Sequence, residues 1–140
     1  MTFGCIGRKV NTVPKVMVIG ADEASSRILT SFLKEAGFEI TTVYDGARLT
    51  ELTRSLPSVV IIEERAGRGA WQLGAQIRQK SNVPIILLGN GNNEVGWVKA
   101  AAYGIDLYMV QPWSARELAA RIKTLVRRYE GNIRELEDVS

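Results

Sequence analysis

The sequence contains no histidine and a single cysteine, Cys5. A histidine-ligated metal, a Ser/His/Asp triad and an intramolecular disulfide are therefore excluded by count. Cys5 lies in a stretch with no predicted helix or strand, where we expect a bystander thiol, with a regulatory or cross-linking role as the alternative. Whole classes of enzyme are thus ruled out before any motif is considered.

Long hydrophobic runs are also lacking. The N-terminal stretch MTFGCIGRKVNTVPK has no apolar core of the length found in signal peptides, and no other segment approaches a membrane span. We therefore expect a cytoplasmic protein without membrane contact. An excess of one charge is missing too, because 18 Lys and Arg against 15 Asp and Glu leave a net charge of +3. So mild and scattered a charge does not predict direct binding of nucleic acid.

What the sequence does contain is a repeated alternation of short apolar runs and helical patterns. Its 140 residues suffice for one domain with a single core, and a hydrophobic content of 46% is typical of globular proteins. The alternation predicts five strand-helix units. The predicted strands are 15–19, 39–43, 59–62, 84–88 and 106–110, and the predicted helices are 23–36, 47–56, 70–80, 94–103 and 114–129.

Strands that are short and apolar throughout need cover on both faces, which indicates a parallel sheet with helices on each side. Right-handed crossovers then give an α/β flavodoxin-like fold, a doubly wound sheet of five parallel strands with five helices. Sites in such folds lie at the carboxyl ends of the strands. The residues found there are Gly20-Ala21, Glu63-Glu64, Gly89-Asn90 and Gln111-Pro112.

Three stretches carry a family resemblance: FLKEAGFEITTVYDGARL, PSVVIIE, and VPIILL together with YGIDLYMVQPWSARELAARIKTLVRR. They resemble the CheY-like receiver domain of response regulators, and the last stretch is most similar to the OmpR/PhoB subclass. The resemblance implies an N-terminal tail at 1–13 and a receiver-like domain at 14–128. Residues 129–140 are then a C-terminal tail, either the start of a linker in a longer parent chain or an extension of the last helix.

The resemblance also assigns roles to the strand ends. In receivers a histidine kinase's phosphoryl group is transferred to an aspartate, and that position holds Glu63 in this sequence. The acidic pair that binds Mg²⁺ corresponds to Gly20 and Ala21, the switch hydroxyl to Gly89, and the phosphate-binding lysine to Gln111. Every member of the set is replaced, so we expect a degenerate phosphoacceptor site with no catalysis, no metal and no cofactor.

Two interpretations of Glu63 remain open. It could mimic a phosphorylated aspartate, or it could be a solvated carboxylate at an open strand end, which we prefer because the residues that would read a mimic are replaced. Tyr108 occupies the family's aromatic switch position, and Gly89 leaves room for its ring to turn inward. We further expect a cis Gln111-Pro112 bond and a packing role for Trp113.

The resemblance implies a homodimer through the helix at 94–103, the strand at 106–110 and the last helix. Trp97 would be the aromatic anchor of this surface, surrounded by charges of both signs, as is typical of such surfaces. The alternative is that this lone helix tryptophan is half-buried and only packs against the domain. Trp71 is expected to pack against the domain or to cover the altered site. The expected interface residues are Trp97, Lys99, Asp106, Glu117 and Arg121.

The sequence thus predicts a phosphorylation-independent receiver that acts as a signalling and dimerisation module in transcriptional regulation, with any DNA-binding effector domain in a longer parent chain. One alternative is a conventional receiver in a phosphorelay with Glu63 as acceptor. The other is a small-ligand binder that uses a vacated pocket, lined by Gly20, Ala21, Glu63, Gly89 and Gln111.

Overall fold

A computed structural model of the protein describes residues 13–20, 22–44, 54, 56–64, 69–89 and 94–139, with the side chains of 25, 94, 95, 97 and 132–139 left aside. The prediction of a helix at 47–56 falls mostly outside these residues. Leu56, at the end of that range, is described: it is exposed, with a φ of 50°, so it is not helical. Leu56 precedes a proline, and proline disfavours helical backbone angles in the residue before it. This explains why the predicted helix does not extend to Leu56.

The centre of the fold is a sheet of five parallel strands in the order β2-β1-β3-β4-β5. This is the flavodoxin-like order, so the predicted fold class is confirmed. The observed bounds agree with the predicted ones to within one residue. The strands are β1 Lys15–Gly20, β2 Glu39–Tyr44, β3 Val59–Glu63, β4 Ile85–Gly89 and β5 Leu107–Val110.

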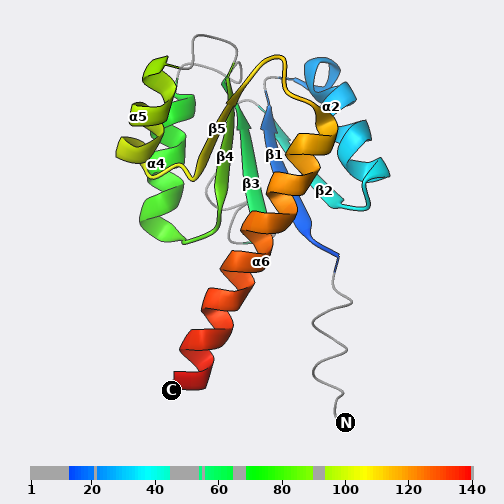
Figure 1. Cartoon of the computed structure of the whole chain (residues 1–140). Coiled ribbons are helices and arrows are strands. Elements are labelled where there is room, and N and C mark those ends of the chain that lie inside the picture. Colours follow the sequence, from blue (N-terminus) through cyan, green and yellow to red (C-terminus); the bar gives the residue numbers. More distant parts are fainter. Residues whose placement is uncertain are drawn as a thin grey trace.

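Helices cover both faces of this sheet (Figure 1). The bounds are α2 Glu23–Glu35, α4 Ala70–Lys80, α5 Glu94–Tyr103 and α6 Ala115–Val139. α2 and α6 pack on one face, while α4 and α5 pack on the other (Figure 1). None of these helices is long and apolar enough to cross a membrane.

The core follows from the alternation of side chains along the buried strands. In β3, Val59 and Ile61 face α2 and α6, whereas Val60 and Ile62 face α4 and α5. Because both faces are covered, the strand needs no polar residue until it reaches Glu63. β3 therefore delivers its first ionisable group, Glu63, at its carboxyl end.

α6 is longer than predicted. The expected end near Tyr129 is exceeded by ten residues, and the helix runs on to Val139, past the amino-terminal edge of the sheet (Figure 1). Residues 129–139 contain one glycine and no proline, so no strong helix breaker interrupts the pattern. The segment thus extends the last helix as far as Val139, and its role as the start of a linker in a longer parent chain stays a prediction.

Candidate functional site

The strand ends meet at one edge of the sheet, as expected. β1 and β3 pair in parallel with Ile19 beside Ile62, and β3 pairs with β4 with Glu63 beside Leu88. Gly20, Glu63 and Gly89 therefore end three adjacent strands. Gln111 follows β5 and is exposed, and Ala21 lies outside the described residues.

Glu63 is anchored to α2. Its Oε1 accepts a hydrogen bond of 2.7 Å from the hydroxyl of Ser26, and Ser26 is fully buried. Glu63 itself is half-buried at the end of β3. A hydrogen bond to a carboxylate is stronger than one between neutral groups, so the partly exposed carboxylate of Glu63 is held by α2 in addition to any contact with solvent.

Gly20 makes this hydrogen bond possible. A Cβ at position 20 would lie 2.5 Å from Oε1 of Glu63, and it would overlap the hydroxyl of Ser26 more severely still. Real Cβ atoms essentially never come this close to another heavy atom. The space that a side chain at position 20 would need is thus already filled by Ser26 and Glu63.

The Mg²⁺ that the resemblance implies does not fit the residues present. Position 20 has no side-chain ligand, and the space beside it holds a hydroxyl that is donated to Glu63 rather than an acidic pair. Within the described ranges no group of three or more Asp, Glu or Cys side chains could hold a metal ion.

Glu64 is the carboxylate that contacts the aromatic switch position. Its Oε2 accepts a 3.1 Å hydrogen bond from the indole N–H of Trp71, and its Oε1 lies 3.5 Å from the hydroxyl of Tyr108. The two rings are tilted against each other with centroids 5.3 Å apart. Trp71 is buried in the core, which confirms the packing role predicted for it, while the covering of the altered site stays a prediction.

The ring of Tyr108 lies inward. Only 6% of the residue is exposed, and its ring sits so close to Gly89 and Gly96 that a Cβ at either position would overlap it. The predicted inward position is confirmed, whereas the role of Tyr108 as a switch stays a prediction. The cis Gln111-Pro112 bond is confirmed too, and Trp113 packs against the core, as expected.

Burial raises the pKa of the Tyr108 hydroxyl above its ordinary value of 10.0, and the negative charge of Glu64 and the hydrogen bond to it add to the effect. The unfolded chain therefore loses this proton at lower pH than the folded one. The stability that depends on it is fully present below pH 10 and declines as the pH rises through the higher, folded pKa.

We accordingly expect the free energy of unfolding to fall above about pH 10 by up to about 1.4 kcal/mol per pH unit on account of Tyr108. Tyr108→Phe should make this decline shallower, as measured by urea unfolding between pH 8 and 11. Tyr44→Phe, at the end of β2, removes a phenol elsewhere and is the matched control. Equal changes of slope in the two variants would contradict the assignment.

Two of the predicted interface residues, Lys99 on α5 and Asp106 just before β5, are engaged within the chain. Lys99 places its Nζ 4.7 Å from the Trp71 ring centroid and 5.9 Å from that of Tyr103. Asp106 forms an ion pair with Arg78 of α4 and accepts a hydrogen bond from the backbone N–H of Ile85.

The rest of this surface stays a prediction. Glu117 and Arg121 are exposed and lie 4.0 Å apart on successive turns of α6. Such exposed pairs contribute little to stability and leave both charges available to a partner. The backbone of Trp97 lies in α5, but its side chain is outside the described set.

Two contacts were not foreseen from the sequence. The hydrogen bond from Ser26 to Glu63 joins residues 37 apart in the chain, and the contact between Tyr108 and Glu64 spans 44 residues. A weak signal existed for the first, since a glycine in place of a metal-binding acid leaves room for a neighbouring polar group. Neither pairing follows from periodicity.

Known proteins resemble the chain in sequence and in fold, although no family model matches it. The sensory transduction protein RegX3 of Mycobacterium tuberculosis is 33% identical over 125 residues, which cover 88% of this chain and 55% of that protein. The chain thus spans about half the length of the curated relatives it matches.

Solved structures extend the comparison to the fold. A receiver domain from Clostridium thermocellum, 19% identical, gives a TM-score of 0.76 and covers 84% of this chain and 98% of its own. The receiver domain of the Francisella response regulator 1452, 25% identical, gives 0.74 with 83% and 98% coverage. The Clostridium structure shows the same fold, and the sequence matches to RegX3 and to the Francisella receiver domain show that the chain belongs to the response-regulator receiver family.

Proposed function

We propose that this receiver domain works without phosphorylation, as a signalling module held in one conformation that acts through contacts with other proteins. The observation that carries the proposal is the filling of two positions that phosphoryl chemistry requires. Ser26 and Glu63 occupy the side-chain space at position 20, and the Tyr108 ring occupies that at position 89. Neither a metal-binding acid nor a switch hydroxyl can be accommodated there without displacing them.

The inward aromatic ring supports the same proposal. In the family this ring turns inward on activation, whereas here Gly89 and Gly96 create the space and Glu64 lies beside the hydroxyl. The idea that Glu63 mimics a phosphorylated residue is correspondingly weakened, because its Oε1 accepts a hydrogen bond from α2. Glu64, one residue later, is the carboxylate that contacts Tyr108.

A role in transcriptional regulation follows from the resemblance to the OmpR/PhoB subclass. It requires a DNA-binding domain in addition to this receiver, and the relatives that match are about twice as long as the matched region. The contact through α5, β5 and α6 would then be with a second copy or with such a partner. This part of the proposal rests on analogy at the level of the family.

The experiment that tests the proposal is the intact mass of the protein after incubation with acetyl phosphate and Mg²⁺. We expect no increase in mass, because Gly20 and Gln111 provide neither the metal ligand nor the cation that phosphoryl transfer needs. A receiver domain with a conventional acidic pair, aspartate and lysine is the positive control. An added phosphoryl group that disappears in Glu63→Gln would establish the conventional alternative and overturn the proposal.

The small-ligand alternative loses support at two of its five lining residues, because the space beside Gly20 and Gly89 is filled by other side chains. A ligand would have to displace the Tyr108 ring or break the hydrogen bond between Ser26 and Glu63. A hollow that the structure does describe lies elsewhere, between α2 and α6.

A further inference from the structure

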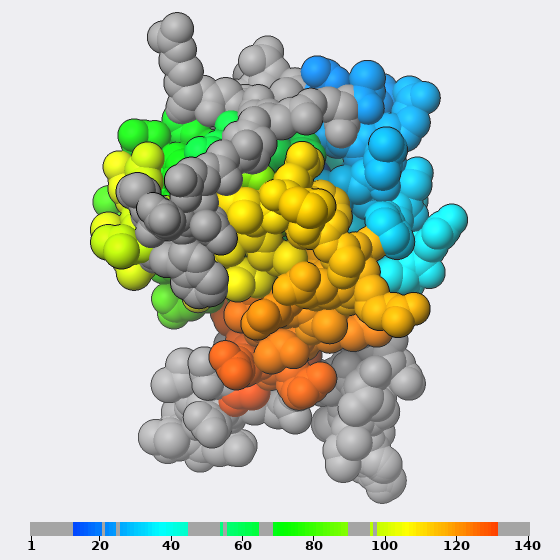
Figure 2. All heavy atoms as spheres, turned by 45° about the horizontal axis from the view of Figure 1, so that its top comes forward, coloured from blue at the N-terminus to red at the C-terminus, as the bar shows by residue number. Residues whose placement is uncertain are grey.

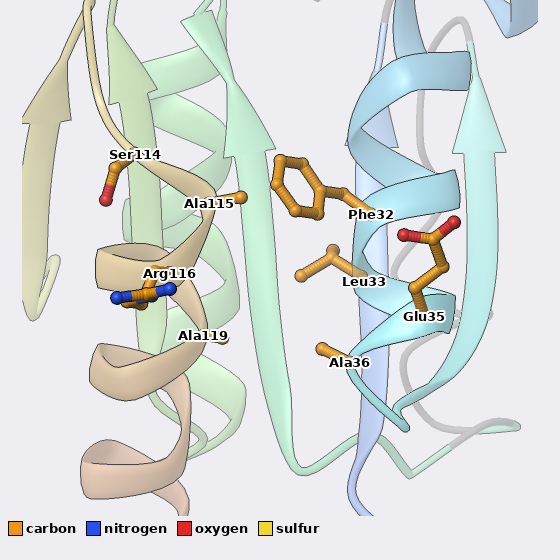
Figure 3. Close-up of a pocket in the computed structure, with 8 residues that line it drawn as sticks. All are labelled: Phe32, Leu33, Glu35, Ala36, Ser114, Ala115, Arg116 and Ala119. Carbon is orange, nitrogen blue, oxygen red and sulfur yellow. The ribbon is translucent and has the colours of Figure 1, made fainter.

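A groove runs between the second half of α2 and the first turns of α6. Its volume is about 520 Å³, and most of its lining is apolar. In Figure 2, where the top of Figure 1 comes forward, α2 and the beginning of α6 adjoin on the surface. Figure 3 shows the Phe32 ring reaching from α2 toward Ala115 on α6. The lining residues are Phe32, Leu33, Glu35, Ala36, Ser114, Ala115, Arg116 and Ala119.

Large apolar side chains stand exposed on α2, and one of them, Phe32, lines this hollow. Ile28 is 78% exposed and Phe32 is 44% exposed, and they lie one turn apart on the same side of α2. Both are apolar residues at helical spacing in α2, yet Leu29 and Leu33 are the residues that enter the core. The groove therefore combines protruding side chains with a floor of small alanines, which lets another helix approach closely.

The two walls carry opposite charges. Glu35 lies at the end of α2, and Arg116 lies in the first turn of α6. Both are exposed, and neither forms an ion pair with any residue that the structure describes. A two-fold axis through the groove would bring Glu35 of each copy opposite Arg116 of the other copy.

We propose that the α2–α6 groove is a contact between two copies of this chain. Ile28 and Phe32 of each copy would pack over the alanines of the other, and Glu35 would pair with Arg116 of the partner subunit. Both the protruding side chains and the hollow belong to one surface, which is the self-complementarity that an isologous interface needs. The patch is smaller than a standard interface, so the dimer is expected to be weak and dependent on concentration.

This contact differs from the predicted surface on α5, β5 and α6, and it does not depend on whether the domain is phosphorylated. Isologous contacts through two different surfaces would build open chains instead of a closed dimer. The two surfaces are therefore alternatives for self-association. The groove has free charges and exposed apolar side chains, whereas Lys99 and Asp106 of the other surface already have partners within the chain.

The test is the molar mass in solution, by sedimentation equilibrium over a wide concentration range, of the wild type, Glu35→Arg and Arg116→Glu. In a dimer of either variant, both contacts between positions 35 and 116 join like charges. Each variant alone should therefore dimerise at least about tenfold more weakly than the wild type. An equimolar mixture of the two variants should dimerise again, because its surfaces carry opposite charges. Pairing within one chain cannot produce this recovery.

Ile28→Lys should also weaken the dimer, whereas Val98→Lys, a matched substitution at a 73% exposed residue of α5, should not. Circular dichroism of every variant checks that it is folded, and exposed positions make this the expected result. The inference is overturned if the wild type is a monomer at all concentrations. It is equally overturned if the variant mixture fails to recover, or if Arg121→Glu abolishes a dimer that the groove variants leave intact.

Discussion

Replacing Gly89 with alanine is expected to lower the free energy of unfolding by about 3 kcal/mol, because the added methyl overlaps a buried ring. A Cβ at this position would lie 2.6 Å from both Cε1 and Cζ of Tyr108 and closer still to its hydroxyl oxygen. The ring already lies close against Gly96 of α5, where there is no room even for a Cβ, so it has little space to retreat toward that helix. Either the ring leaves the inward position or the strand moves.

A double-mutant cycle with Tyr108→Ala separates this overlap from other effects of the substitution. Once the ring is absent, Gly89→Ala should cost less than about 1 kcal/mol, so the two substitutions should be strongly coupled. Gly131→Ala in α6, where nothing lies within 4 Å of the added Cβ, is the matched control and should be neutral or slightly stabilising. Urea unfolding measures all of these, and an equal cost of Gly89→Ala in both backgrounds would contradict the explanation.

The expected result bears on how this domain departs from its family. The family's switch residue at this position carries a hydroxyl on a Cβ, and here that Cβ would overlap Tyr108. Gly89 and the inward ring therefore depend on each other. A single substitution toward the family pattern should damage the domain instead of restoring a switch.

The sheet was predictable because its signal is local. Runs such as VVII in β3 are apolar on both faces, and this pattern indicates a parallel strand covered on each side. The bounds of β1 and β4 each extend one residue further than predicted, to Gly20 and Gly89, because the ladder between strands continues through these glycines. The pattern of apolar residues in the sequence does not indicate where the hydrogen-bond ladder between two strands stops.

Helix faces were less predictable. Ile28 and Leu29 are adjacent on the apolar stripe of α2, yet one is exposed and the other is in the core. Leu29 packs into the core with β1, β3 and α6, whereas Ile28 lies outside it, and which side of α2 turns inward depends on packing across the whole sheet. The stripe is wider than the surface that one neighbour covers, so its outer edge stays exposed.

The site itself was half predictable. The resemblance located Gly20, Glu63 and Gly89 at one edge, and the structure brings them together there. The Tyr108 ring was predicted to enter the space beside Gly89. The filling of position 20 by Ser26 was not predicted, because it depends on a hydrogen bond to Glu63, 37 residues away in the chain. Contacts of that kind depend on tertiary geometry and leave no local pattern.

Gly20→Ala should cost about as much as the substitution at position 89, about 3 kcal/mol, because the new Cβ falls on the Ser26 hydroxyl and on Oε1 of Glu63. Both atoms belong to a hydrogen bond with a fully buried donor, so moving them also weakens that bond. Glu63 can move at the flexible end of its side chain, whereas Ser26 is fixed close to its helix. The hydroxyl should therefore account for most of the cost.

Ser26→Ala provides the decisive comparison. Alone it should cost about 2 kcal/mol, since it removes a hydrogen bond to a carboxylate. It also removes the atom nearest to the added Cβ, while Cβ of Ser26 lies 3.4 Å away, an ordinary contact. Gly20→Ala should then cost no more than about 1 kcal/mol in the Ser26→Ala background, giving a coupling of about 2 kcal/mol.

Additive costs in this cycle would mean that Ser26 and Glu63 do not fill the position, and the structural basis for excluding a metal-binding acid there would be lost. Strong coupling leads to a further expectation for Gly20→Asp, which supplies the missing acid. With Ser26 present, this variant should be as destabilised in Mg²⁺ as in EDTA. With Ser26→Ala as well, the added carboxylate has space beside Glu63, and Mg²⁺ should then raise the midpoint of thermal unfolding. Binding of Mg²⁺ would thus be controlled by the serine on α2 and not by the absence of one carboxylate alone.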